Sequence, residues 1–393
     1  MKTIFRYTNL GLLLVVMMAM GTVAAVAQDP CADAEGMTSL GDKVRADFAV
    51  KTIEGRKAFL ESGKQFQEKY GKCEPGKELD AWLTTTMPKT KVALDKQIED
   101  EAKKKLLTRF DTGLKAKNWD EVYASGKEVL AKYPDEFRAV ELVLGSIGYD
   151  EMFAGNNKFS DETLKFAKQS LASLEAGKEF KPNFGVGQFS YKTREEATAW
   201  MNLTIGSIYQ IAQKNKAAAL PYLYKATLAA DTAKNPNPYE FIGGYYFDEL
   251  NKIVEEIQVK SKEQNDADTP EVAQKKVDEL KALVAKSNGT AERAMDAFSR
   301  AFSLGQKPDY KARMKKNVEE AYNVRFGKKE PVDSWIATAV AKPFVNPQTP
   351  IAPITDPEPV KTDATSSAPT TPAPAKPAAP IKPAQAAKPG DKQ

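Results

Sequence analysis

In residues 117–135, KNWDEVYASGKEVLAKYPD, the sequence marks both ends of one short helix. Asn118 is a preferred N-cap residue, and Glu121 stands three positions later, where its side chain can complete a capping box. Pro134 ends the helix because a proline ring cannot continue it. Between these ends, apolar residues recur at helical spacing and form one stripe, made of Trp119, Val122, Gly126, Val129, Leu130 and Tyr133. A helix this short cannot bury its stripe alone, so we expect partner helices on either side.

The composition favours a folded, helical protein. Of the 393 residues, 42% are apolar and 28% are charged, as in ordinary globular proteins. Basic and acidic residues number 57 and 53, and this small excess of positive charge does not indicate nucleic-acid binding. The chain has no histidine, which excludes Ser-His-Asp and Cys-His mechanisms and most zinc sites.

The opening stretch resembles the second helix of a tetratricopeptide repeat (TPR). That family carries a G-D-Y-D-E-A-I…A-L…P run there, and residues 118–122, Val129-Leu130 and Pro134 fall on it in register. The family's small, aromatic, small and aromatic positions are matched in spacing further along the chain by Gly206, Tyr209, Ala218 and Tyr222. The resemblance implies an all-α fold, a TPR-like antiparallel helix-pair solenoid over residues 28–345.

One departure from the family's pattern makes a packing prediction. The family has a small residue where Phe110 stands and an aromatic residue where Gly126 stands. If the two positions face each other, the exchange of sizes keeps the packed volume, and such exchanges are tolerated in cores.

Prolines and capping residues predict several helix boundaries. Pro88, Pro270 and Pro308 are each expected to open a helix, because proline suits the first helical turn. Ser160 and Thr193 are expected to cap one each. Residues 136–153 are expected to form a single helix.

Residues 1–27 resemble a signal peptide for export. Lys2 and Arg6 precede an apolar run, and Ala25-Val26-Ala27 matches a cleavage site. An uncleaved membrane anchor is the alternative, although the apolar run is short for a span. Cleavage predicts a periplasmic or secreted protein with no stable membrane span.

Export also bears on the two cysteines. In an oxidising compartment, Cys31 and Cys73 are expected to form an intramolecular disulfide. Free thiols and an intermolecular bridge are the alternatives.

The composition changes at Asn346. Half of the 24 prolines lie beyond it, together with alanine, threonine, serine and spaced lysines. Such a segment cannot bury a core, so residues 346–393 are predicted to be a disordered Pro/Ala/Lys-rich tail. The tail is either a solvated segment or a recognition segment for another envelope component.

No stretch of the sequence carries a catalytic pattern. Residues 184–187, FGVG, lack the third glycine and the lysine of a phosphate-binding loop. The adjacent pairs Glu195/Glu196 and Glu255/Glu256 read as charges on helix surfaces. We therefore expect no enzyme, no cofactor and no metal site. A carboxylate-based envelope hydrolase stays the less favoured alternative, because such carboxylates can come from distant segments.

By resemblance, the expected function is binding of a partner protein or extended peptide on the concave face of the solenoid. That face would be formed mainly by the first helix of each pair, with Lys104, Leu107, Asp111, Trp200, Leu203, Ser207 and Gln210 on it. Packing of Trp200 and Leu203 against the next pair is the competing interpretation. A structural envelope spacer that acts through its Pro-rich tail is the alternative function.

Overall fold

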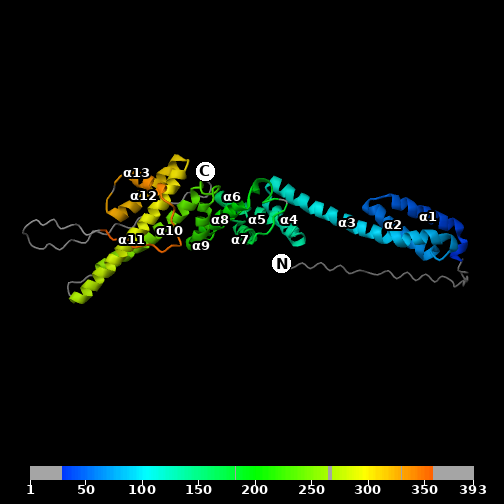
Figure 1. Ribbon diagram of the computed structural model, residues 1–393, viewed down its shortest axis with the longest axis horizontal. Helices are drawn as coiled ribbons and strands as arrows, with labels where there is room; N and C mark the ends of the chain where they lie inside the picture. Colours follow the sequence, from blue (N-terminus) through cyan, green and yellow to red (C-terminus); the bar gives the residue numbers. More distant parts are fainter. Residues whose placement is uncertain (1–28, 182, 264–267, 329, 357–393) are drawn as a thin grey trace, which may run out of the picture. The chain divides into compact units, whose positions relative to one another are not determined.

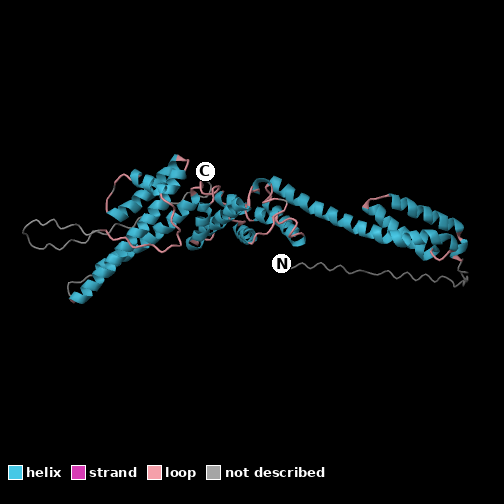
Figure 2. Ribbon diagram, viewed as in Figure 1, coloured by secondary structure: helices cyan, strands magenta, loops and turns pink. Residues whose placement is uncertain are grey.

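The computed structural model describes residues 29–181, 183–263, 268–328 and 330–356. They form helices α1 to α13, three short 3-10 helices and connecting loops, with no strand among them (Figures 1 and 2). A single isolated bridge joins Phe184 to Tyr191 within the described residues. The predicted all-α class is confirmed. The predicted signal peptide lies outside the described residues, and no described helix is both long and apolar enough to cross a membrane.

The described residues divide into two compact units, unit 1 up to Lys105 and unit 2 from Leu106. In unit 1, α1 (Ala34–Ala49) and α2 (Ile53–Tyr70) pack against each other, and the first part of α3 (Lys77–Ala116) joins their core. Phe48, Phe59 and Trp82 make mutual ring contacts there, with centroids 5.0–5.7 Å apart. These three aromatic rings close the core of a small three-helix unit.

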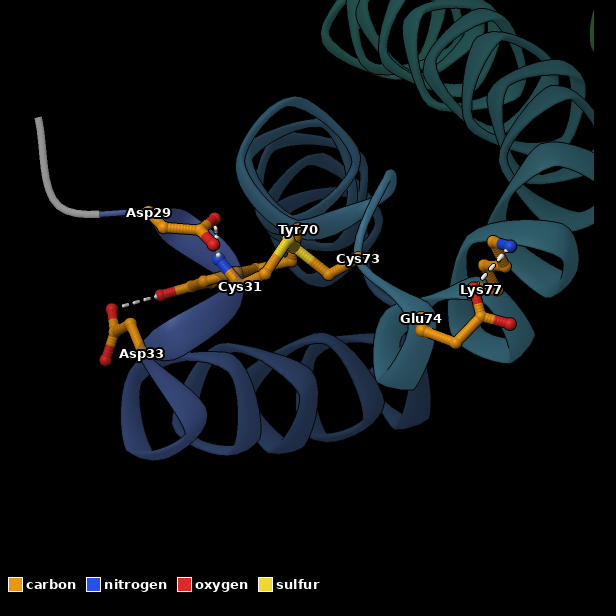
Figure 3. The surroundings of a disulfide bond; sticks show 7 residues. All are labelled: Asp29, Cys31, Asp33, Tyr70, Cys73, Glu74 and Lys77. Atoms are coloured by element: carbon orange, nitrogen blue, oxygen red, sulfur yellow. Dashed lines mark hydrogen bonds and ion pairs between the residues drawn. A yellow bond between two sulfur atoms is a disulfide. The ribbon is translucent and has the colours of Figure 1, made fainter.

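A disulfide ties the start of unit 1 to the end of α2 (Figure 3). Cys31 lies in the short η1 (Pro30–Ala32), and its Cα is 5.2 Å from that of Cys73. The predicted bridge is confirmed, and it is compatible with a non-cytoplasmic location. Beside it, the Asp33 carboxylate accepts hydrogen bonds from the Gly36 backbone N–H at 2.9 Å and from the Tyr70 hydroxyl at 2.6 Å.

Unit 2 begins within α3, at Leu106, and its next helix is the one that the opening stretch predicts. Helix α4 (Trp119–Lys132) starts after Asn118, whose side chain accepts a hydrogen bond from the Glu121 backbone N–H. A Cβ at Gly126 would lie 3.1 Å from Cε2 of Phe110, so the two size-exchanged positions do face each other, as predicted. Trp119 is buried, and its indole N–H donates to Glu151 at 2.8 Å.

The chain continues through short helices α5 (Ala139–Leu144) and α6 (Ile147–Phe153) to α7 (Ser160–Glu175), α8 (Arg194–Ile211) and α9 (Lys216–Leu228). It then forms α10 (Asn237–Lys262), α11 (Pro270–Leu304), α12 (Pro308–Phe326) and α13 (Asp333–Ala341). From α7 to α12 each helix packs on the next, and α13 packs on α11. The core of α9 to α13 is the largest apolar cluster, and it is built around Tyr246, Phe247 and Phe298.

Three of the predicted boundaries are wrong. Pro88 lies inside α3, because burial of Leu83 in the core of unit 1 holds the preceding turn in the helix. The predicted helix over residues 136–153 breaks at Gly145, where a Cβ would come within 2.8 Å of the Ala167 backbone nitrogen on α7. Ser160 is the first residue of α7 instead of its cap, and its hydroxyl has no partner.

The other predicted boundaries are confirmed. Thr193 caps α8 through the Glu196 backbone N–H, and Pro270 and Pro308 open α11 and α12. Helix α11 runs without a break through Gly289.

Candidate functional site

An extended segment after α13 lies against α10, α11 and α12 (Figure 1). We call residues 342–356, KPFVNPQTPIAPITD, the strap. It contains four prolines and no regular secondary structure. Its last eleven residues were predicted to begin a disordered tail at Asn346, yet defined contacts hold the chain to the helices as far as Asp356. Residues 357–393 lie outside the described residues.

The backbone carbonyls of the strap face a row of donors on α11. Arg300 donates to Lys342 O at 2.6 Å and to Ala339 O, just before the strap, at 2.9 Å. Arg293 donates to Asn346 O at 3.4 Å, and Asn288 donates to Ile354 O at 3.0 Å. The strap therefore runs antiparallel to α11. The α11 residues that approach the strap are spaced by four or seven positions, so they lie on one face of the helix. They are Ala285, Gly289, Arg293 and Arg300.

Two further backbone contacts complete this row. The Tyr246 hydroxyl on α10 donates to Pro347 O at 3.3 Å. The Ile354 backbone N–H donates to Ala285 O at 2.9 Å, although Ala285 lies within α11. A proline-rich extended chain leaves most of its carbonyls without internal partners, and here arginine, asparagine and tyrosine side chains supply donors. Asn346 O also accepts a hydrogen bond within the strap, from the Thr349 backbone N–H at 3.0 Å.

Four apolar side chains anchor the strap, at spacings of three, four and three residues. Pro347 is buried, and Phe344, Ile351 and Ile354 are half-buried. The Phe344 ring lies 5.1 Å from the Tyr239 ring, edge to face, and the Arg300 guanidinium lies over it at 5.1 Å. Arg300 thus binds both the backbone and a side chain of the strap.

Gly289 lets the strap approach the surface of α11. A Cβ there would lie 2.3 Å from Ala352 O and 2.9 Å from a methyl carbon of Ile351. A glycine in the middle of a helix costs about 0.5–1 kcal/mol relative to alanine. The close approach of the strap gives this cost a structural reason.

The end of the strap meets a buried guanidinium. Arg325 on α12 donates from its two terminal nitrogens to the Asp356 carboxylate, at 2.8 and 2.9 Å, and from Nε to Glu292 at 2.9 Å. Its side chain is only 5% exposed, whereas that of Asp356 is 59% exposed. The hydrogen bonds from Arg325 lower the pKa of Asp356. The carboxylate is therefore ionised at neutral pH and paired in the bidentate geometry that arginine favours.

Asp296 orients the guanidinium at the other end of the row. It accepts from Arg300 Nε at 3.0 Å, and burial raises its pKa. We define the channel as the surface that holds the strap, formed by Tyr246, Ala285, Asn288, Gly289, Arg293, Arg300 and Arg325.

Two of the residues predicted to face a partner are fully buried, and this part of the prediction is wrong. Leu203 and Ser207 are both 0% exposed. Helix α8 contacts α6, α7, α9 and α10, so residues 201–208 are enclosed on all sides. Trp200 and Gln210, which lie on α8 outside this enclosed stretch, are half-buried.

The predicted residues on α3 have different environments. Lys104 is exposed and belongs to unit 1. In unit 2, Leu107 is half-buried against the core around α4, and Asp111 is exposed and paired with Lys115.

Trp200 belongs to a row of half-buried aromatic residues. Its ring lies 6.0 Å from that of Tyr149, which lies 5.0 Å from Phe153, which in turn stacks on Phe241 at 6.5 Å. These rings come from α6, α8 and α10 and pack on one another. The competing interpretation of Trp200, as a packing residue, accounts for these contacts.

The channel residues were not predicted from the sequence. Two local signals were present in the sequence: Gly289 lies in the middle of a helical stretch, and Ile351 and Ile354 interrupt a proline-rich tail. The two isoleucines have little weight in the overall composition of residues 346–393, which is dominated by proline and alanine.

Among the described residues, no three histidine, cysteine, aspartate or glutamate side chains gather in a way that could hold a metal ion. Comparison of the chain with protein-family models, with curated proteins and with solved structures finds no match.

Proposed function

We propose that the protein is an exported, non-catalytic binding scaffold that holds an extended polypeptide segment of a partner protein in the channel on α10, α11 and α12. The proposal moves the expected binding surface from the concave face, with its residues on α3 and α8, to the channel. The observation that carries it is the strap itself. An extended segment of this chain is already held there through its backbone carbonyls and four apolar anchors.

The chemistry of the channel suits peptides in general. Every peptide has backbone carbonyls, so donors such as Asn288 and Arg293 contribute affinity that does not depend on sequence. The surfaces on which Phe344 and Pro347 pack then supply selectivity, because they favour apolar side chains of similar shape. This division of roles supports a binding site for extended segments.

The test is a pull-down from envelope extracts with three full-length forms of the protein. Gly289→Ala places a methyl group where the strap or a partner would approach, and Gly244→Ala is the matched control, since a Cβ there meets nothing within 4 Å. Partners should be captured by the wild type and by Gly244→Ala and lost with Gly289→Ala. A synthetic peptide of residues 342–356 should release them.

Contacts at the end of the strap favour a second candidate function, the envelope spacer. Arg325 fixes the chain at Asp356, so whatever follows leaves the domain from a fixed point. A chain ending at Asp356 separates the two functions. Partners that are captured by the truncated chain but not by Gly289→Ala bind the channel. Partners that are captured by Gly289→Ala but not by the truncated chain bind residues 357–393.

A further inference from the structure

The most selective group in the channel is Arg325, and its surroundings show how it is prepared. Glu292 holds Nε at 2.9 Å, which leaves the two terminal nitrogens directed at the carboxylate of Asp356. The side chain is only 5% exposed, so little water competes for those donors. In this contact the Arg325 side chain is therefore buried, whereas the Asp356 side chain on the strap is largely exposed.

We expect this arrangement to persist when the strap departs. Without Asp356, Arg325 keeps its ion pair with Glu292, so no isolated charge is left behind. Removing one partner of a buried pair is costly when the remaining charge has nothing to pair with, and here it does. The site can therefore exist empty and accept another carboxylate.

The strap itself is lightly held. Among its fifteen residues, Pro347 alone is buried, four are half-buried and ten are exposed. Its bonds to α10, α11 and α12 come from side chains, apart from the Ile354 N–H to Ala285 O bond. Segments with few buried apolar contacts open at low free-energy cost.

We propose that the channel selects extended peptides carrying an acidic residue two positions after an apolar anchor, that Arg325 reads this acid, and that the strap is a built-in competitor for such peptides. This inference rests on the proposed function. The strap defines the ligand class through anchors at 344, 347, 351 and 354 and a carboxylate at 356. A tethered segment competes at an effective concentration of order millimolar, so the intact chain binds free peptides weakly.

The experiment uses the full chain with its strap released and its channel unchanged. The double variant Phe344→Ser, Ile354→Ser removes two anchors from the strap and alters no channel residue. Fluorescence anisotropy then follows a labelled peptide of residues 342–356. We expect this peptide to bind the released chain at least about tenfold more tightly than the wild-type chain.

A second peptide tests the acid directly. It carries Asn at the position of Asp356, which leaves the shape and removes the charge. Hydrogen bonds to charged groups contribute about 1.5–3 kcal/mol, so its affinity for the released chain should fall about 10- to 100-fold. In a released chain that also carries Arg325→Gln, the two peptides should bind equally. Because the substitution in the peptide cannot affect folding, the test holds even if Arg325→Gln unfolds the chain.

The outcomes separate this inference from the proposed function. Equal binding of the two peptides to the released chain would show that Arg325 does not recognise the acidic residue. It would leave the proposed peptide-binding function unaffected. Absence of binding by either peptide, with α11 and α12 still protected from hydrogen exchange, would overturn both. Gly289→Ala in the released chain should abolish binding, and Gly244→Ala should preserve it.

Discussion

Gly289 illustrates how one missing side chain can define a surface. In isolation a glycine weakens the middle of a helix, and alanine would strengthen it. Here a methyl group would collide with Ala352 O at 2.3 Å. Helix stability and strap docking therefore make opposite demands on this position.

The two demands can be measured separately. We expect Gly289→Ala to raise the hydrogen-exchange rate of the Ile354 amide, which donates to Ala285 O, without lowering protection within α11. Gly244→Ala, with open space around it, should leave the Ile354 amide protected. Retained protection of Ile354 in Gly289→Ala would show that the strap can shift aside without leaving.

Trp119 makes a second prediction at the scale of one residue. It is 9% exposed, its ring meets that of Phe189 at 6.1 Å, and its N–H reaches Glu151. Trp119→Ala should lower the free energy of unfolding of unit 2 by about 3–5 kcal/mol, measured by denaturant titration. Leu228→Ala is the control, because Leu228 is 65% exposed and its loss should cost about 0.5 kcal/mol or less.

Single helices show which physical signals the sequence carries and which it lacks. The ends of α4 and α8 were predictable, because capping by Asn118 and Thr193 depends on neighbouring residues alone. The burial of Ser207 was not, because it depends on four other helices that meet α8. A helical stripe indicates that a face is buried but does not guarantee that the opposite face is exposed.

The same distinction applies to the candidate site. The sequence analysis predicted a peptide-binding surface with residues on α3 and α8, but the neighbours of α8 cover Leu203 and Ser207. The channel depends on contacts between residues as distant as Tyr246 and Pro347, which no local pattern reveals. Only Gly289 and the two isoleucines of the strap departed locally from their surroundings.

The first turn of α1 supports a prediction about pH. Asp33 caps this helix, and hydrogen bonds from Tyr70, from the Gly36 backbone and from Lys69 lower its pKa to about 2. Since the folded-state pKa lies below the unfolded value of 3.8, the charge of Asp33 stabilises the fold above about pH 4. That contribution is lost as the pH falls toward 2.

Asp33→Asn keeps a capping oxygen and removes the charge. Amide protection in α1 should be lower in this variant than in the wild type at pH 5–7, and the two should converge near pH 2. A difference that stays constant across this range would assign the effect to shape rather than charge.

At the scale of the whole molecule, the disulfide acts on one unit. Cys31 and Cys73 are separated by 42 residues, and closing such a loop stabilises a protein by roughly 3–4 kcal/mol. Replacement of both cysteines by serine should therefore reduce amide protection in α1 and α2. Protection in α10 to α12, which belong to unit 2, should not change. A parallel loss in both units would show that they unfold together.

The chain's C-terminal part can be divided by truncation. Ending the chain at Asp356 keeps every strap contact with α10, α11 and α12. The melting temperature should therefore stay within about one degree of the full-length value. Ending it at Ala341 removes the whole strap and should lower the melting temperature by several degrees, because Pro347, Phe344 and the pair between Arg325 and Asp356 are lost. Differential scanning calorimetry on both forms checks the pair. Equal melting temperatures would mean that the strap contributes no stability.

The order of the channel and the strap along the chain decides which of them is synthesised first. All of the channel residues, from Tyr246 to Arg325, come before Lys342, so a chain that emerges N-terminus first completes the channel before its own strap arrives. At roughly 5–20 residues per second, the stretch between Phe326 and Lys342 takes about one to three seconds to appear. During that interval a nascent chain presents an empty channel. Under the proposed function, we expect a partner segment present at that moment to meet no competitor and to be incorporated as the protein is made.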